Sequence, residues 1–185
     1  MKPCCTSPRC KCPRCKCPLY KGRCGFTLIE LMISISVAAI LFSLAVPQFS
    51  KITQTARMTS ARNGIFTAFQ LARTEAITRR VHVVVCASAE GERCSGAWES
   101  GALVFVDANQ NRQRESSERL LTQLSADDFK NLGVQGSRSL TSFGPDGRSG
   151  GSNQTLAFCA PGRTDGLSVV VSNVGRIRMG KTVCS

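Results

Sequence analysis

The sequence predicts an α+β protein in which one long N-terminal helix, first transmembrane and then amphipathic, packs on an antiparallel β-sheet. Three observations support this class. Residues 26–46 carry a single charged side chain, residues 50–80 repeat apolar side chains every three or four positions, and residues 81–185 contain short β-branched runs separated by turn residues. The length of 185 residues is that of one domain.

Residues 1–25 form a basic, cysteine-rich leader that we expect to be removed. They contain seven of the 24 Lys and Arg residues, seven of the eleven cysteines and no acidic residue. Without them, the net charge falls from +12 to +5, since 17 basic and 12 acidic residues are left. The run from Cys10 to Cys17 has a spacing that suits thiolate binding of a metal. We favour a true start codon further downstream and expect no metal site there.

Residues 26–49 are expected to be a transmembrane helix. The 21 residues 26–46 would form a helix about 32 Å long, the thickness of a bilayer core. Because basic residues precede it, the leader should stay in the cytoplasm and the rest should cross the membrane in a single pass. An ordinary signal peptide is cut after its apolar region at small residues, and the sequence before Pro47 is a poor match. A cut before the apolar region would leave the anchor on the mature chain.

Glu30 is the charged residue of this segment. A carboxylate at bilayer depth costs about 2.5–3.5 kcal/mol on insertion scales, so it should have a partner. No basic side chain lies within the next twenty residues. A cut between Gly25 and Phe26 would create an α-amino group one helical turn away, in the same or a neighbouring subunit. An ordinary anchor with Glu30 at headgroup level is the alternative that the residues alone leave open.

The string Gly25-Phe26-Thr27-Leu28-Ile29-Glu30-Leu31 resembles the class III signal of type IV pilins and type II secretion pseudopilins. The resemblance implies a pilin-like fold, cleavage after Gly25 by a prepilin peptidase, N-methylation of Phe26 and a role for Glu30 in assembly with other pilins. It also implies an inner-membrane precursor with a periplasmic globular region, which later joins a pilus or pseudopilus. The cysteine run departs from the short basic leaders of this family.

Residues 50–80 should continue the helix beyond Pro47, where we expect a bend or an interruption. An apolar stripe at steps of three and four is made by Met58, Ala61, Ile65, Phe69, Ala72 and Ala76. Such a stripe is expected to pack against a sheet. A basic nucleic-acid face formed by the arginines of this helix is the alternative.

After residue 80 the pattern becomes that of short strands. The predicted strands are 81–86, 102–106, 119–124, 129–134, 140–143, 155–159 and 167–172. His82, the single histidine, is interpreted as an ordinary sheet residue and not as a catalytic base. Without a second histidine or a recognisable catalytic motif, we predict that the protein is not an enzyme.

Four cysteines follow the leader, and an even number in an exported domain suggests two disulfides. We prefer Cys86 with Cys94, which would enclose a short hydrophilic loop. Cys159 with Cys184 would then tie the C-terminal tail to an earlier strand. Three pairings are possible from the sequence, and four reduced thiols are the alternative.

One loop imitates part of a calcium site. Asp107, Asn109 and Asn111 alternate along the chain, and Glu118 follows Asp107 by eleven residues. However, Arg112 occupies the position where glycine is needed for the sharp turn, and Arg112 and Arg114 bring positive charge to a cation site. We therefore predict a polar hairpin turn, and no metal or other cofactor.

The tail contains two arginines in an alternating pattern. In an extended strand Arg176 and Arg178 would project from one face. Paired guanidinium groups suit phosphate oxygens and bind nucleic acid without reading its sequence. An edge strand whose charges prevent aggregation is the alternative interpretation.

The order of features after the helix resembles the GspH/FimT subfamily of minor pilins and pseudopilins. The features are Cys86…Cys94, Trp98 followed by 103–109 (LVFVDAN), and the ending Gly175-Arg176-Ile177-Arg178. The resemblance implies a FimT-like minor pilin, in or at the tip of a pilus, that binds DNA in natural transformation through Gly175, Arg176 and Arg178. Lys181 is added for its charge and proximity. The alternative is a GspH-like pseudopilin of a type II secretion system, which has an assembly role and does not bind DNA.

Overall fold

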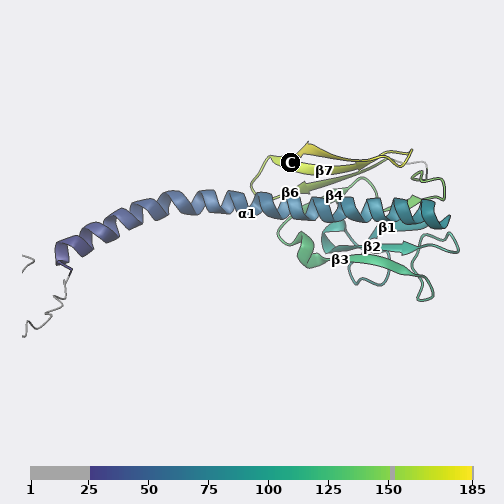
Figure 1. Cartoon of the computed structure of the whole chain (residues 1–185), viewed down its shortest axis with the longest axis horizontal. Coiled ribbons are helices and arrows are strands. Elements are labelled where there is room, and N and C mark those ends of the chain that lie inside the picture. Colours follow the sequence, from purple (N-terminus) through teal and green to yellow (C-terminus); the bar gives the residue numbers. More distant parts are fainter. Residues whose placement is uncertain (1–25, 151–152, 185) are drawn as a thin grey trace, which may run out of the picture. The chain divides into compact units, whose positions relative to one another are not determined.

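The computed structural model describes residues 26–150 and 153–184 (Figure 1). The chain divides between Leu44 and Ala45 into an N-terminal unit and a C-terminal unit. The leader 1–25, with Gly25 and the cysteine run, lies outside the described residues. The described elements are helix α1 (Leu28–Arg79), strands β1 (Val83–Ala87), β2 (Gly101–Val106), β3 (Leu120–Ser125), β4 (Gly133–Gly136), β5 (Leu140–Phe143), β6 (Gln154–Cys159), β7 (Asp165–Val171) and β8 (Ile177–Val183), and the 3-10 helices η1 (Trp98–Ser100) and η2 (Ala126–Phe129).

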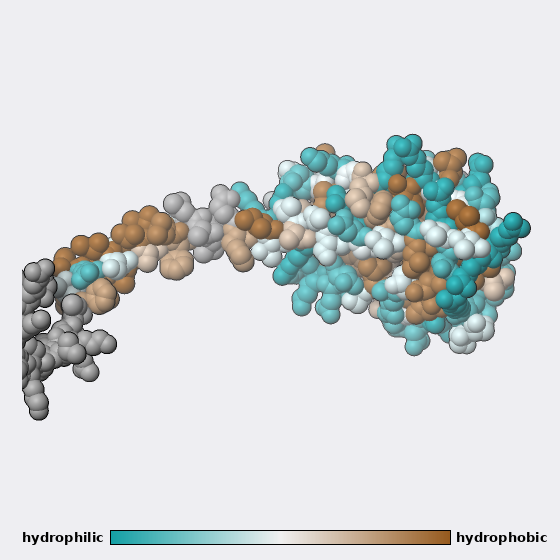
Figure 2. Space-filling view, viewed as in Figure 1, coloured by the Kyte–Doolittle hydropathy of each residue, from teal (hydrophilic) through white to brown (hydrophobic). Residues whose placement is uncertain are grey.

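The described part of the N-terminal unit is the beginning of α1. The Glu30 backbone N–H donates to Thr27 Oγ1 at 3.2 Å, so Thr27 caps the helix and Glu30 lies in its first turn. Consecutive apolar side chains are exposed here, among them Leu28 and Ile29, so the apolar surface is not confined to one stripe (Figure 2). Within the residues that the structure describes, no helical segment has both the length and the hydropathy needed to cross a membrane. The assignment of residues 26–49 as a transmembrane helix stays a prediction.

In the C-terminal unit, α1 presents its apolar stripe to the β-strands. The backbone is helical through Pro47, so an interruption at this residue does not occur, while the alternative of a bend stays a prediction. The predicted stripe is confirmed, because all six of its side chains are buried: Met58, Ala61, Ile65, Phe69, Ala72 and Ala76. They belong to one hydrophobic cluster with residues from strands of two sheets, which flank α1 in Figure 1.

The strands form two antiparallel sheets where the sequence predicted one. The first sheet has the order β3-β2-β1-β5 and the second has the order β4-β6-β7-β8. The predicted strand 129–134 is wrong over its first half, since Phe129 ends η2 and is buried. Ser125 and Asp128 cap η2, with the Ser125 N–H donating to Asp128 Oδ2 at 2.8 Å. Strand pairing resumes at Gly133, in the second sheet.

Aromatic contacts join α1 to the first sheet and its flanking 3-10 helix, and hydrogen bonds then link this helix to β6 of the second sheet. The Phe69 ring is fully buried, with ring centroids 6.4 Å from Trp98 and 6.3 Å from Phe143. Arg138, between β4 and β5, accepts hydrogen bonds at its carbonyl oxygen from Trp98 Nε1 at 2.7 Å and from Gln154 Nε2 at 3.0 Å. Burial of one large apolar side chain contributes about 1.5–3 kcal/mol, so this shared core is a major source of stability.

The structure contains the two disulfides in the pairing that the sequence favoured. Cys86–Cys94 joins residues eight positions apart, and Cys159–Cys184 joins residues 25 positions apart. Cys86 belongs to a second, smaller cluster on the other face of the first sheet, where Cys94 packs against it. Cys184 follows β8 directly, so the second bond fixes the end of the last strand to the end of β6.

We expect the two disulfides to stabilise the domain unequally. In the loop-entropy account a disulfide contributes roughly 2–4 kcal/mol, and more for a longer loop. Replacing Cys159 and Cys184 by serine should therefore lower the free energy of unfolding by about 1 kcal/mol more than replacing Cys86 and Cys94. Urea unfolding of the full chain in detergent, followed by Trp98 fluorescence, measures both values. Equal losses, or a larger loss for the shorter loop, would contradict the entropic explanation.

Candidate nucleic-acid interface at the β7–β8 hairpin

The tail arginines lie at the start of an edge hairpin. Strands β7 and β8 are antiparallel, with Val171 opposite Ile177. The Gly175 N–H donates to the Ser172 carbonyl at 2.8 Å, and the Ser172 N–H donates to the Arg176 carbonyl at 2.9 Å. Gly175 has a φ of +79°, the left-handed conformation required at the last position of this short loop. Gly175 of the predicted motif thus forms the turn that precedes both arginines.

The tip of this hairpin is held against the loop between β5 and β6. A Cβ atom on Gly175 would lie 1.8 Å from the Gly147 carbonyl oxygen, so the two backbones are in direct contact. Arg73 of α1 donates from Nε to the same oxygen at 3.2 Å. The Ser149 N–H donates to the Asn173 carbonyl at 3.1 Å. The position of the hairpin tip is therefore tied to α1 through a neighbouring loop.

Arg176 and Arg178 are both exposed, as a solvent-facing binding site requires. Arg178 pairs with Val170, whereas Ile177 pairs with the buried Val171 and packs against the core. Side chains alternate along a strand, so Arg178 belongs to the outer face of the second sheet, and continuing the alternation by one residue assigns Arg176, directly before β8, to the same side. Among the described residues, neither guanidinium group makes a hydrogen bond or an ion pair.

Lys181 differs from the two arginines in its position. It pairs with Leu167, which packs against the core, so the alternation assigns Lys181 to the opposite face from Arg178. Asp165 lies close enough to Lys181 for an electrostatic interaction between its carboxyl group and the positive charge. The hydrogen bond from Arg163 Nη2 to Asp165 Oδ2, at 2.6 Å, is the main cause that lowers the pKa of Asp165, and Lys181 lowers it further. The structure therefore does not group Lys181 with Arg176 and Arg178.

Two further arginines border a cleft that the sequence did not indicate. Arg112 and Arg148 line an open cavity of about 520 Å³, together with Asp107 and Asp146. Arg148 belongs to the loop that supports the hairpin tip, whereas Arg112 comes from the β2–β3 connection. No spacing in the sequence relates these positions, because separate connections bring them to one cleft.

The residues predicted to act in processing and assembly lie at the beginning of the described chain. Phe26 is exposed and precedes α1. The Glu30 side chain is exposed as well, and it forms no ion pair with any described residue. The roles of Gly25, Phe26 and Glu30 stay predictions.

Comparison with known protein families identifies the family to which the chain belongs. Residues 61–175 match the family model described as Type II transport protein GspH, and this match covers more than half of the 185 residues. The chain belongs to the GspH family. In addition, residues 20–46 of this GspH-family chain match the prokaryotic N-terminal methylation motif.

A solved minor pilin structure shows a similar fold. One crystal form of the type IV minor pilin FimU of Pseudomonas aeruginosa gives a TM-score of 0.56 at 21% identity, and the alignment covers 70% of this chain and 92% of FimU. A second crystal form gives a TM-score of 0.52 at 22% identity, and the alignment covers 66% of this chain and 91% of FimU. The minor pseudopilin EpsH from the type 2 secretion system of Vibrio cholerae gives a TM-score of 0.49 at 13% identity, covering 67% of this chain and 96% of that chain. No curated protein sequence matches the GspH-family chain.

These findings define the class of the protein. The GspH-family chain is a minor pilin or pseudopilin of a type IV pilus or a type II secretion system. Members of this family are structural proteins and not enzymes. The methylation motif implies processing by a prepilin peptidase, anchoring in the inner membrane and assembly with other pilins.

Replacing Gly175 by alanine should disturb the hairpin tip more than the left-handed backbone alone explains. A non-glycine residue at positive φ costs about 1 kcal/mol, and here the added methyl group would also overlap the Gly147 carbonyl. Gly162 is the matched control, since it has a φ of +73° and open space around its Cβ position. We expect the free energy of unfolding to fall by more for Gly175→Ala than for Gly162→Ala, measured by urea titration. Equal losses would show that the contact with Gly147 is unimportant.

Proposed function

We propose that this GspH-family chain is a FimT-like minor pilin that assembles into or at the tip of a pilus and binds DNA during natural transformation. Arg176 and Arg178 would bind the DNA backbone without reading its sequence. The observation that supports this proposal is the pair of exposed guanidinium groups on the outer face of an edge strand, without an acidic partner among the described residues.

The geometry of a strand suits two phosphate contacts. Side chains two residues apart in a strand are separated by about 6.6 Å. Each DNA strand carries one phosphate per approximately 3.4 Å of helix axis. Two long arginine side chains at this separation span about two phosphate steps along the axis and can each contact a phosphate of one strand. Each planar guanidinium donates several N–H groups in a fork that matches phosphate oxygens.

The surroundings of Arg178 favour an anion. Across the second sheet its neighbours on the same face are Val170 and then Thr155, which are both uncharged. Strands β6, β7 and β8 contain a single acidic residue, Asp165, and its carboxylate is already bonded to Arg163. The face that presents Arg178 therefore has no carboxylate from these strands to repel a DNA backbone.

Replacing both Arg176 and Arg178 by alanine should weaken DNA binding by about 10-fold or more at moderate salt. Each phosphate contact to duplex DNA contributes a slope of about −0.9 in a plot of log affinity against log salt concentration. The slope should therefore become less steep by nearly 2. The measurement is fluorescence anisotropy of labelled duplex DNA with the full chain in detergent, at several NaCl concentrations and with two unrelated DNA sequences.

A double variant that removes the same charge elsewhere provides the control. Arg93 and Arg119 are exposed and lie in parts of the chain associated with the first sheet. Their replacement by alanine should change the affinity and the salt slope much less. Lys181→Ala should also have a smaller effect than Arg178→Ala, because Lys181 belongs to the opposite face. Unchanged affinity and slope in the tail variant would refute the assignment of Arg176 and Arg178.

The second candidate is a GspH-like pseudopilin that acts in the assembly of a type II secretion filament and does not bind DNA. The description of the matching family model favours it. Deletion of the gene distinguishes the two candidates, because loss of transformation supports the first and loss of protein secretion supports the second. The identity of the neighbouring genes gives the same information at lower cost.

We also propose that Glu30 pairs with the new α-amino group of Phe26 in the same or a neighbouring subunit. The side chain has no ionic partner among the described residues, while its backbone N–H is held by Thr27. Glu30→Ala should permit membrane insertion and cleavage but reduce incorporation into filaments or methylation of Phe26. Glu30→Gln keeps the shape and should show the same defect, since the charge is what pairs. Normal incorporation and methylation in both variants, measured by immunoblotting of sheared filaments and by mass spectrometry, would contradict the pairing.

A further inference from the structure

The connection between β2 and β3 contains a buried carboxylate with an incomplete set of partners. Asp107 is 2% exposed. Its Oδ2 atom accepts a hydrogen bond from the Arg112 N–H at 3.1 Å, so the carboxylate faces the inside of the loop. Its Oδ1 atom is also buried and has no hydrogen-bond partner among the described residues. Buried carboxylates are normally paired or bound to a cation, and this oxygen atom is free to act as a cation ligand.

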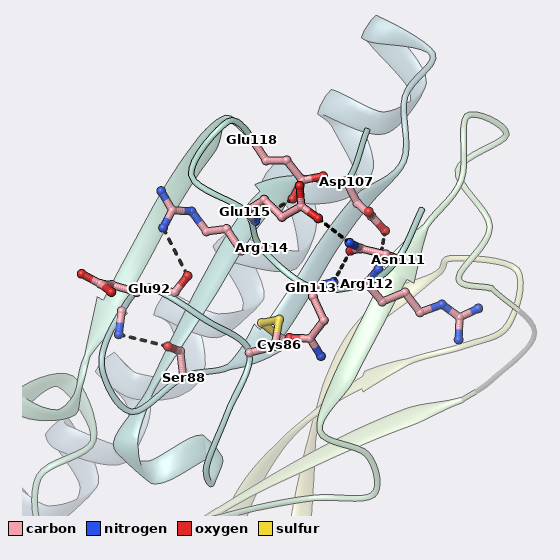
Figure 3. The surroundings of a disulfide bond; sticks show 12 residues. Cys86, Ser88, Glu92, Asp107, Asn111, Arg112, Gln113, Arg114, Glu115 and Glu118 are labelled. Atoms are coloured by element: carbon pink, nitrogen blue, oxygen red, sulfur yellow. Dashed lines mark hydrogen bonds between the residues drawn. A yellow bond between two sulfur atoms is a disulfide. The ribbon is translucent and has the colours of Figure 1, made fainter. Parts of the chain in front are cut away.

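The loop makes the turn that a cation loop needs, although it has arginine where glycine was expected. Arg112 adopts a φ of +61° and directs its N–H group to Asp107. Its side chain extends away from the loop interior in Figure 3 and lines the neighbouring cleft. Arg114 is turned to the opposite side, where Nη1 donates to the Glu92 carbonyl at 3.2 Å. The objection to the turn therefore does not apply to the folded loop, and both guanidinium groups point away from its interior while their positive charges stay beside it.

Further oxygen-bearing side chains converge on the same loop (Figure 3). The Glu115 Oε1 atom accepts hydrogen bonds from the side-chain amides of Asn109 at 2.9 Å and Asn111 at 2.8 Å. Glu118 is 7% exposed, and its two oxygens accept the N–H groups of Ala108 at 2.9 Å and Glu115 at 3.1 Å. Counted from Asp107 as position 1, the asparagines and glutamates occupy positions 3, 5, 9 and 12, which are the ligand positions of a calcium loop.

We propose that residues 107–118 bind one calcium ion. Asp107 Oδ1 is the preformed ligand, and the amide oxygens of Asn109 and Asn111 with the carboxylates of Glu115 and Glu118 complete the set. Among the described residues, no three His, Cys, Asp or Glu side chains already stand close enough to hold a metal. Binding therefore requires the two glutamates and the two amides to turn from their present partners to the ion. A set made entirely of oxygen atoms on an adaptable loop suits calcium better than zinc or magnesium.

The test uses the full chain in detergent, from which a chelator has removed bound metal. Calcium binding is measured by calorimetric titration with CaCl2, and thermal unfolding is recorded at several calcium concentrations. We expect one calcium ion per chain, with a dissociation constant of about 10⁻⁴–10⁻³ M, the range of extracellular modules. The unfolding midpoint should rise with calcium concentration, because the ion binds the folded chain. Asp107→Asn should weaken binding by at least about 10-fold, since it removes the charge of the preformed ligand. Asp127→Asn, which removes an exposed carboxylate outside the loop, should leave binding unchanged.

Arg112→Gly provides an independent test that does not depend on the folding of the Asp107 variant. It removes a positive charge beside the ion and places glycine at the left-handed position, so calcium should bind about 3-fold more tightly or better. Absence of binding to the unmodified chain up to about 10 mM calcium, above the range of known modules, would overturn the proposal. Binding that survives unchanged in Asp107→Asn, or an equal response to magnesium, would overturn it as well.

Discussion

The structure depends on the burial of one helical stripe between two sheets. The stripe from Met58 to Ala76 supplies one side of a core whose other sides are the inner faces of the first and the second sheet. Neither sheet has a complete core of its own, because the largest cluster combines residues from both with those of α1. The same helix begins at Thr27 as the segment that carries the methylation motif. One element thus connects the part of the chain used for processing and assembly with the part that forms the globular fold.

The position of the tail arginines depends on this core through a short series of contacts. Arg73 leaves α1 and binds the Gly147 carbonyl, which in turn contacts Gly175 at the hairpin tip. The motif glycine consequently has a structural explanation that does not require DNA, whereas the side chains of the two arginines make no hydrogen bond or ion pair among the described residues. This contrast matters for interpreting any variant of the motif. A substitution at Gly175 changes the position of the two arginine side chains. A substitution at Arg176 or Arg178 changes the groups that are available to bind a ligand.

Local patterns in the sequence predicted the elements well and their assembly poorly. The helical stripe and most strand positions follow from side-chain periodicity, and the disulfide pairing follows from short connections between strands. The division into two sheets could not be predicted, because it depends on which distant strand each one pairs with. β4, for example, pairs with β6 and not with the strand that precedes it.

Lys181 was grouped with the arginines from its nearness in sequence, but the strand register places it on the other face. Arg112 was considered unable to make its turn, and only the folded loop shows that its backbone adopts the left-handed conformation.

The bond between Cys159 and Cys184 has a mechanical consequence. It anchors β8, the outermost strand of its sheet, to the end of β6 at a point just after Val183. An edge strand secured only by hydrogen bonds to β7 would be the first part of this sheet to separate under tension. With the covalent link in place, a pull on β8 is shared with the interior strand β6. In a reducing environment that sharing would be lost, and β8 would separate at a lower force.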